Sequence, residues 1–199
     1  MSLSCYNAVK RTEEQKKLGQ RPKCYLSYID SIFVGDSSLS MSDMGDGPID
    51  GSKKFMKKYK EMGDKYIDKT INVSFISFND DAKWVYNGCA DKITNYIVEL
   101  TGLNMLPKGS TRLYDTMIEA IEFQQYRVDK YYKSLSKEVI RLEPKISVNI
   151  TLLTDGIDNS SRSYMEEMNE KIVSHKNEYD ATCFFIAANQ DATAAGLQY

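Results

Sequence analysis

The sequence has one histidine and four cysteines, and this shortage limits the chemistry that it can support. Catalytic pairs of serine or cysteine with histidine need the imidazole as a base, and His175 lies in an expected helix, far along the chain from the polar motifs described below. We therefore expect no such catalysis, and we interpret His175 as a surface residue of its helix. The cysteines form no Cys-x-x-Cys pair, so a zinc site is not expected. They are Cys5, Cys24, Cys89 and Cys183, and we expect four free thiols in a reducing compartment.

Long apolar runs and an excess of one charge are also missing. No apolar run approaches the roughly 20 residues that a membrane-spanning helix needs. The net charge of -2 gives no general electrostatic reason to bind nucleic acid or an anionic membrane. Residues 1–20 have no apolar core of a signal peptide, so we expect a cytoplasmic location.

What the chain does have is the composition of an ordinary globular domain. Hydrophobic residues make up 42% and charged residues 27% of its 199 residues, which suits one domain with a proper core. We expect an N-terminal arm over residues 1–22 and a single domain over residues 23–199.

Apolar periodicity alternates between strand and helix along this domain. Strands are expected at 23–35, 71–78, 82–86, 146–153 and 181–188. Helices are expected at 52–68, 90–100, 113 to about 133 and 160–178. Loops or connectors are expected at 43–51, 134–144 and 189–191. The two strands at 71–86 are close enough to form a hairpin. The order predicts an α/β fold, a doubly wound and mostly parallel sheet with one antiparallel edge strand.

Oxygen-bearing side chains follow the first expected strand. Asp36, Ser38 and Ser40 are spaced two apart, so a tightly turning segment can direct their oxygens to one point. One carboxylate and two hydroxyls suit Mg²⁺, Mn²⁺ or Ca²⁺ rather than zinc. A polar turn that caps the next helix is the alternative interpretation of this stretch.

Two later residues extend this pattern. Thr111 lies in the turn just before the helix expected from residue 113, where a helix cap is its common alternative role. Asp155 follows the strand at 146–153 and precedes Gly156, which permits a sharp turn. Because the carboxyl ends of parallel strands meet at one edge of the sheet, these loops are expected to lie together. The sequence thus predicts a metal site with ligands Asp36, Ser38, Ser40, Thr111 and Asp155.

These three motifs, in this order, resemble the metal-ion-dependent adhesion site of the von Willebrand factor A (vWA) domain family, which has the pattern D-x-S-x-S, then T, then D. The likeness covers roughly residues 25–199, and 184–191 resembles the closing strand of small, free-standing members in bacteria and viruses. It implies a Rossmann-like vWA fold in which Asp36 acts mainly through water or neighbouring ligands. Ser38, Ser40 and Thr111 would offer hydroxyl oxygens, and Asp155 would bind directly or through water.

The chain departs from the family pattern at two places. Gly35 stands where the family has an apolar strand residue, which suggests a kink in the strand. The sequence also ends at Tyr199, where the family continues with a further strand or helix, so the last helix is either missing or replaced by an early closure of the fold.

The resemblance implies a protein-binding module without catalytic activity. Two carboxylates and neutral hydroxyls leave a divalent ion able to accept another anionic oxygen, which a glutamate or aspartate of a partner protein would supply. One alternative is a Mg²⁺-dependent phosphohydrolase of the haloacid-dehalogenase type, although Ser38 replaces the second aspartate of that motif. The other is a structural vWA domain whose metal site is unused.

Overall fold

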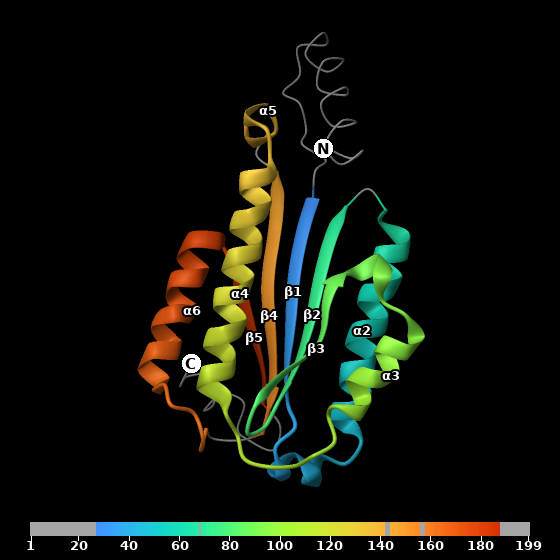
Figure 1. Ribbon diagram of the computed structural model, residues 1–199, viewed down its shortest axis with the longest axis vertical. Coiled ribbons are helices and arrows are strands. Elements are labelled where there is room, and N and C mark those ends of the chain that lie inside the picture. Colours follow the sequence, from blue (N-terminus) through green and yellow to red (C-terminus); the bar gives the residue numbers. More distant parts are fainter. Residues whose placement is uncertain (1–26, 68, 142–143, 156–157, 188–199) are drawn as a thin grey trace.

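The computed structural model describes residues 27–67, 69–141, 144–155 and 158–187 (Figure 1). The expected N-terminal arm at 1–22 and the loop at 189–191 lie outside these residues. The described chain contains the strands β1 (Ser27–Asp36), β2 (Thr70–Phe78), β3 (Ala82–Cys89), β4 (Lys145–Thr154) and β5 (Thr182–Ala187). Its helices are η1 (Leu39–Met44), α2 (Gly47–Lys65), η2 (Ala90–Lys92), α3 (Asn95–Leu103), α4 (Leu113–Ser134), α5 (Lys137–Ile140) and α6 (Met165–Tyr179).

The strands form one sheet in the order β3-β2-β1-β4-β5. β1 pairs in parallel with both β2 and β4, and β5 pairs in parallel with β4. β3 returns from β2 in a hairpin and is the one antiparallel strand of the described sheet. It lies at one edge, and β5 lies at the other. The predicted α/β fold with one antiparallel edge strand is therefore confirmed.

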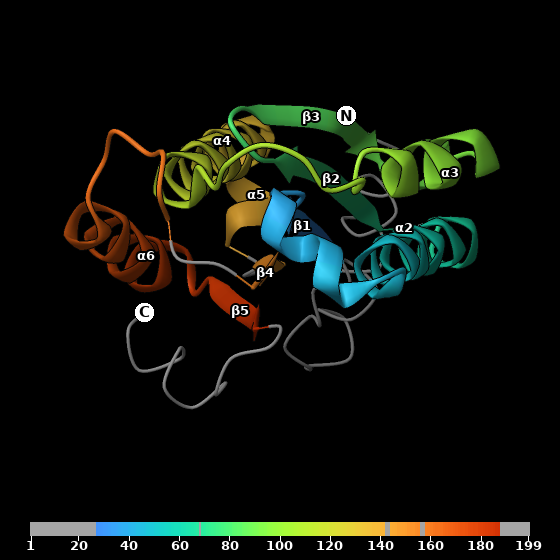
Figure 2. The same ribbon diagram turned by 90° about the horizontal axis from the view of Figure 1, so that it is seen from below.

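Successive residues of β1 face opposite sides of the sheet, and a separate core covers each side. Ile32 and Val34 belong to the core under α4 and α6, whereas Phe33 belongs to the core under α2 and α3. Figure 2 shows α4 and α6 on one side of the sheet and α2 and α3 on the other. The central strands of the sheet are thus buried on both faces, as in most parallel sheets, whereas Phe184 and Ile186 leave one face of β5 exposed. Among the described residues, no helix has the length and apolar character needed to cross a membrane.

Two expected connecting segments contain helices. The prediction of a loop at 43–51 is wrong, because η1 continues to Met44 and α2 begins at Gly47. Pro48 stands in the first turn of α2, where its missing N–H costs nothing. The connector at 134–144 contains α5, whose first turn is capped by the Ser136 hydroxyl.

One expected helix is broken and another begins late. The expected helix at 90–100 is divided into η2 and α3, because the Thr94 hydroxyl accepts a hydrogen bond from the Ile97 N–H and starts a new helix there. α6 begins at Met165 rather than at 160, because the residues before it are bonded to α4 instead.

The suggested kink at Gly35 is absent. Gly35 pairs in regular register with Ser77 on one side and Leu153 on the other. A Cβ atom at this position would lie 2.6 Å from the Met105 sulfur. The glycine therefore makes room for a buried side chain and does not bend the strand.

The interpretation of His175 as a surface residue is wrong. Its side chain is fully buried between α6 and α4, and its Nε2 lies 2.8 Å from the Gln124 side-chain oxygen. Burial lowers the pKa of His175 to about 4, so the imidazole is neutral near pH 7. Cys89 and Cys183 are free thiols in the structure, as expected for these two cysteines.

Candidate metal centre

Three chain segments meet at the carboxyl edge of the sheet, below the strands in Figure 1. The segment after β1 is bonded to the loop before α4, because the Lys108 N–H donates to the Ser37 carbonyl (2.8 Å) and the Leu39 N–H donates to the Gly109 carbonyl (3.1 Å). The segment after β4 is bonded to the same loop, since the Asn159 N–H donates to the Thr111 carbonyl (3.0 Å). The topology therefore brings together the three segments that the sequence singled out.

Four of the five predicted ligands form one connected chain of hydrogen bonds. The Ser38 N–H donates to Asp36 Oδ1 (2.8 Å), and the Ser38 and Ser40 hydroxyls are 3.0 Å apart. The Ser40 hydroxyl in turn donates to Asp155 Oδ1 (2.9 Å). Residues separated by more than 110 positions along the sequence are thus in direct contact.

Thr111 is buried, with 2% of its surface exposed, and it is bonded to the segment that follows Asp155. Its N–H donates to the Asn159 side-chain oxygen (2.7 Å), and its carbonyl accepts from the main chain of Asn159 and Ser160. Thr111 is not the cap of α4, because the capping position is Arg112 and no side chain there caps the helix. Its alternative role as a cap is therefore wrong.

Sequence reasoning missed Asp158, which caps α4 from a distant part of the chain. Its Oδ1 accepts hydrogen bonds from the Leu113 N–H (2.7 Å), the Tyr114 N–H (3.3 Å) and the Ser161 hydroxyl (2.6 Å). The available signal was the polar run 158–161, which contains the residue types that cap helices. Asp158 satisfies the free N–H groups of α4 and fixes the segment that follows Asp155.

Asp115 makes a second attachment between α4 and the segment before α6. Its carboxylate accepts from the main-chain N–H groups of Arg162 (3.1 Å) and Ser163 (2.9 Å) and from the Arg112 guanidinium (2.9 Å). Burial acts to raise the pKa of Asp115, but these hydrogen bonds outweigh it and lower the pKa to about 2. The loop that carries Asp155 is therefore held at both Asp158 and Asp115.

The electrostatic environment of Asp36 is unusual for a buried carboxylate. Asp36 is fully buried, and its Oδ2 accepts from the Thr154 hydroxyl (2.6 Å). Burial raises its pKa, the hydrogen bonds from Thr154 and Ser38 oppose this, and the nearby Asp155 charge raises it further. None of the ion pairs between described residues includes Asp36.

The donor set fits a hard divalent cation. Two carboxylates and the serine hydroxyls offer oxygen atoms only, and Ser40 is exposed while Asp155 is half-buried, so the site is open to solvent. Groups of three or more His, Cys, Asp or Glu suited to a metal are absent from the described residues. The set predicted here has another composition, two carboxylates with three hydroxyls, and its role as a metal site stays a prediction.

Comparisons with known proteins reveal similarity at the level of the fold. No protein-family model matches the sequence, and no curated protein matches it. The pilus adhesin SpaC of Lactobacillus rhamnosus GG has a TM-score of 0.54 at 13% identity, over 84% of this chain and 26% of SpaC. The D319A mutant of the PilB minor pilin of Streptococcus sanguinis has a TM-score of 0.52 at 16% identity, over 86% of this chain and 53% of that one.

A third similar structure is described as the vWF domain of the type V pili tip protein Mfa5 of Porphyromonas gingivalis. It has a TM-score of 0.45 at 14% identity, over 65% of this chain and 38% of that one. The chain thus spans between 26% and 53% of the length of these three structures. The α/β fold of this protein is similar to that of SpaC and of the PilB minor pilin.

Proposed function

We propose that this protein is a metal-dependent protein-binding module. Asp36, Ser38, Ser40, Thr111 and Asp155 would hold a divalent cation, Mg²⁺, Mn²⁺ or Ca²⁺, and a glutamate or aspartate of a partner protein would complete the site. The observation that carries this proposal is the environment of Asp36. A buried carboxylate whose hydrogen-bond donors are neutral, with a second carboxylate near it, is stabilised in its ionised form by a bound cation.

The residues of the chain would orient and limit the site. The Ser38 N–H and the Thr154 hydroxyl hold one oxygen each of the Asp36 carboxylate, so its direction is set by the end of β1 and by β4. Ser40 and Asp155 lie at the surface side of the same chain of hydrogen bonds, where a partner can reach. A bound divalent ion supplies Lewis acidity, which attracts an anionic oxygen.

Two further observations support binding rather than catalysis. SpaC is described as a pilus adhesin and has a comparable fold, which favours an interaction role. The only histidine is bonded to Gln124 in the interior, so it does not serve as a base at the carboxyl edge. A protein interaction is therefore the function that the site supports best.

A peptide-binding experiment tests this proposal. Backbone amide resonances of the protein are recorded with an acetylated and amidated Gly-Glu-Gly peptide, in Mg²⁺ or Mn²⁺ and again in EDTA. We expect shifts around Ser38, Ser40 and Asp155 only with metal, and their loss in Asp36→Asn. The matched Gly-Gln-Gly peptide should produce none, and equal shifts with both peptides or in EDTA would contradict the proposal.

An enzyme assay separates the phosphohydrolase alternative from this proposal. The protein is incubated with p-nitrophenyl phosphate and Mg²⁺, and phosphate release is followed over time. We expect no turnover above that of the Asp36→Asn variant. Metal-dependent turnover that disappears in this variant would instead assign Asp36 a catalytic role.

A further inference from the structure

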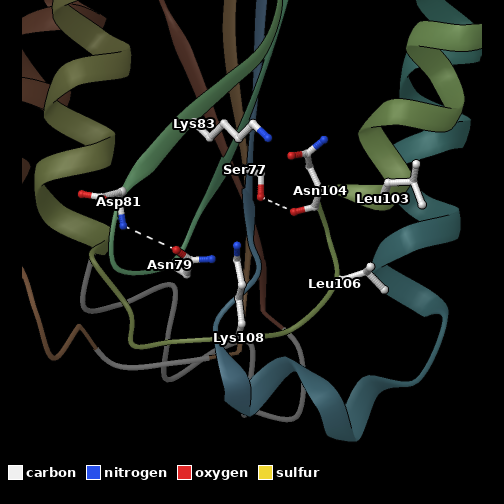
Figure 3. Close-up of a pocket in the computed structure, with 8 residues that line it drawn as sticks. All are labelled: Ser77, Asn79, Asp81, Lys83, Leu103, Asn104, Leu106 and Lys108. Atoms are coloured by element: carbon white, nitrogen blue, oxygen red, sulfur yellow. Dashed lines mark hydrogen bonds between the residues drawn. The ribbon is translucent and has the colours of Figure 1, made fainter.

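A second feature of the carboxyl edge is a pocket of about 320 Å³. It lies between the end of β2, the start of β3 and the segment that joins α3 to α4 (Figure 3). Its volume is at the lower end of the range for ligand pockets, about 300 to 1,000 Å³, which suits one side chain better than a large cofactor.

Two lysines give this pocket its charge. The Lys83 and Lys108 side chains both direct their ammonium groups toward its centre (Figure 3). Neither lysine takes part in an ion pair with another described residue. Two neighbouring positive charges that lack a carboxylate at contact distance favour an anionic ligand.

The two aspartates nearest these lysines are turned to other partners. Asp81 also lines the pocket, but its carboxylate points away from the other lining residues in Figure 3 and acts on the charge of Arg112. Asp80 accepts hydrogen bonds from the N–H and the hydroxyl of Ser110, and it interacts with Lys108 only at longer range. The positive charge of the pocket is therefore only partly offset.

The neutral polar side chains of the pocket already have partners inside the protein. The Ser77 hydroxyl donates to the Asn104 carbonyl, the Asn104 amide donates to the Leu100 carbonyl (2.7 Å), and the Asn79 amide donates to the Ser37 hydroxyl (3.3 Å). The Asn79 and Asn104 amides each keep a second N–H, and the two ammonium groups are the charged donors of the pocket. On the rim, Leu106 is 54% exposed and offers an apolar contact.

One residue connects the pocket to the predicted metal site. The Ser37 hydroxyl lies 3.0 Å from the Ser77 hydroxyl in the pocket wall, and the Ser37 carbonyl accepts from the Lys108 N–H (2.8 Å). Ser37 also stands between Asp36 and Ser38 in the sequence. The pocket and the site are therefore adjacent, and an extended segment that rises about 3.3 Å per residue can span them within a few residues.

We propose that this pocket binds a second acidic side chain of the partner protein. The partner would then present a short extended segment with two carboxylates, one for the metal site and one for Lys83 and Lys108. This inference rests on the proposed function, and it adds a requirement for the partner sequence. Charge complementarity supports it, because both subsites select an anionic oxygen at one edge of the sheet.

The test uses peptides with two glutamates separated by one to four glycines, with counterparts in which either glutamate is replaced by glutamine. Their dissociation constants from the Mg²⁺-loaded protein are measured by amide chemical shifts. We expect the two-glutamate peptide of one spacing to bind about tenfold more tightly than its single-glutamate counterparts. Each exposed ion pair should raise the affinity by about twofold to fivefold. Lys83→Gln combined with Lys108→Gln should remove this advantage and leave the metal-dependent binding of single-glutamate peptides unchanged.

The control is Lys133→Gln combined with Lys176→Gln, an equal change of charge at exposed positions of α4 and α6. It should keep the full advantage of the two-glutamate peptide. The pocket proposal is overturned if no spacing exceeds the single-glutamate peptides, or if the double variant keeps the advantage; metal-dependent binding of one glutamate would still support the proposed function. Loss of metal-dependent binding for every peptide would overturn both. A further outcome is that acetate alone saturates the two lysines while the two-glutamate peptides bind no more tightly than the single-glutamate peptides. In that case the pocket binds a free carboxylate, and the pocket proposal is also overturned.

Discussion

Two aspartates of the same strand, Asp30 and Asp36, are both fully buried but have different surroundings. Asp30 lies in the middle of β1, where its Oδ1 accepts from the Arg127 guanidinium (2.5 Å) and the Gln124 amide (2.9 Å). Its Oδ2 accepts from the Tyr28 hydroxyl (2.9 Å). Asp36 lies at the end of the strand, where it accepts from the Thr154 hydroxyl and from the main-chain N–H of Ser38.

The two carboxylates differ in how their negative charge is balanced by neighbouring groups. Burial raises the pKa of both carboxyls; Arg127 opposes the rise at Asp30, whereas the Asp155 charge adds to it at Asp36. The interior cluster contains its own cation, so it is a structural element. The cluster at the edge lacks a comparable ion pair among the described residues, so a cation from solution would complete it.

The largest expected effect comes from breaking the interior cluster. Arg127→Met should lower the free energy of unfolding by about 3 to 5 kcal/mol, because it leaves the buried Asp30 carboxylate without its cation. Urea denaturation measures this loss. The control is Lys171→Met, which removes an ion pair with Glu122 at the surface and should cost less than about 1 kcal/mol. Equal losses in the two variants would contradict the assigned role of Arg127.

The next effect concerns the edge cluster and depends on metal. At about 100 times the dissociation constant, Mg²⁺ or Mn²⁺ should add about 2.7 kcal/mol to the stability of the folded protein. Asp36→Asn should keep the fold and lose this gain, as thermal unfolding with and without metal will show. Asp43→Asn, an exposed acid of η1, should keep it. If Mg²⁺ or Mn²⁺ stabilises Asp36→Asn as much as the parent protein, Asp36 is not a ligand of the metal.

The interior cluster should also produce a specific pH dependence. The ordinary pKa of histidine is 6.5, whereas His175 in the folded protein has a pKa of about 4. The unfolded chain therefore binds a proton first, and stability falls as the pH drops from 6.5 toward 4. Between these values, the parent should lose about 1.4 kcal/mol per pH unit more than His175→Gln does.

Because the chain has one histidine, this difference reports on His175 alone. Urea denaturation of the two proteins at a series of pH values measures it. Parallel pH profiles would mean that His175 is accessible to protons in the folded state, against its observed burial.

The smallest expected effect tests how the edge cluster is supported. Asp158→Ala should cost about 1 kcal/mol, because the first N–H groups of α4 lose their acceptor. It should also weaken metal binding, since Asp158 fixes the segment after Asp155. The control is Asp46→Ala at the start of α2, where the side chain makes no capping hydrogen bond. A smaller loss in Asp158→Ala than in this control would contradict the capping role.

Much of the fold could be predicted because the information is local. The helix expected from Leu113 to about residue 133 is found at Leu113–Ser134, and the strand expected at 71–78 is found at Thr70–Phe78. In both, the apolar residues recur at the period of the element, and the period reflects backbone geometry alone. The three oxygen-bearing motifs were also visible, because each follows a strand or precedes a helix.

Other features depend on which surfaces meet, and a local pattern does not contain this information. The alternation of strands and helices follows from the local sequence, and so does the position of the oxygen-bearing residues that we predict as ligands. The burial of His175 against Gln124, the contact of Gly35 with Met105 and the capping by Asp158 of a helix 45 residues earlier depend on the tertiary structure. The physical reason is that burial and hydrogen-bond pairing are set by contacts between distant segments, whereas periodicity is set within each segment.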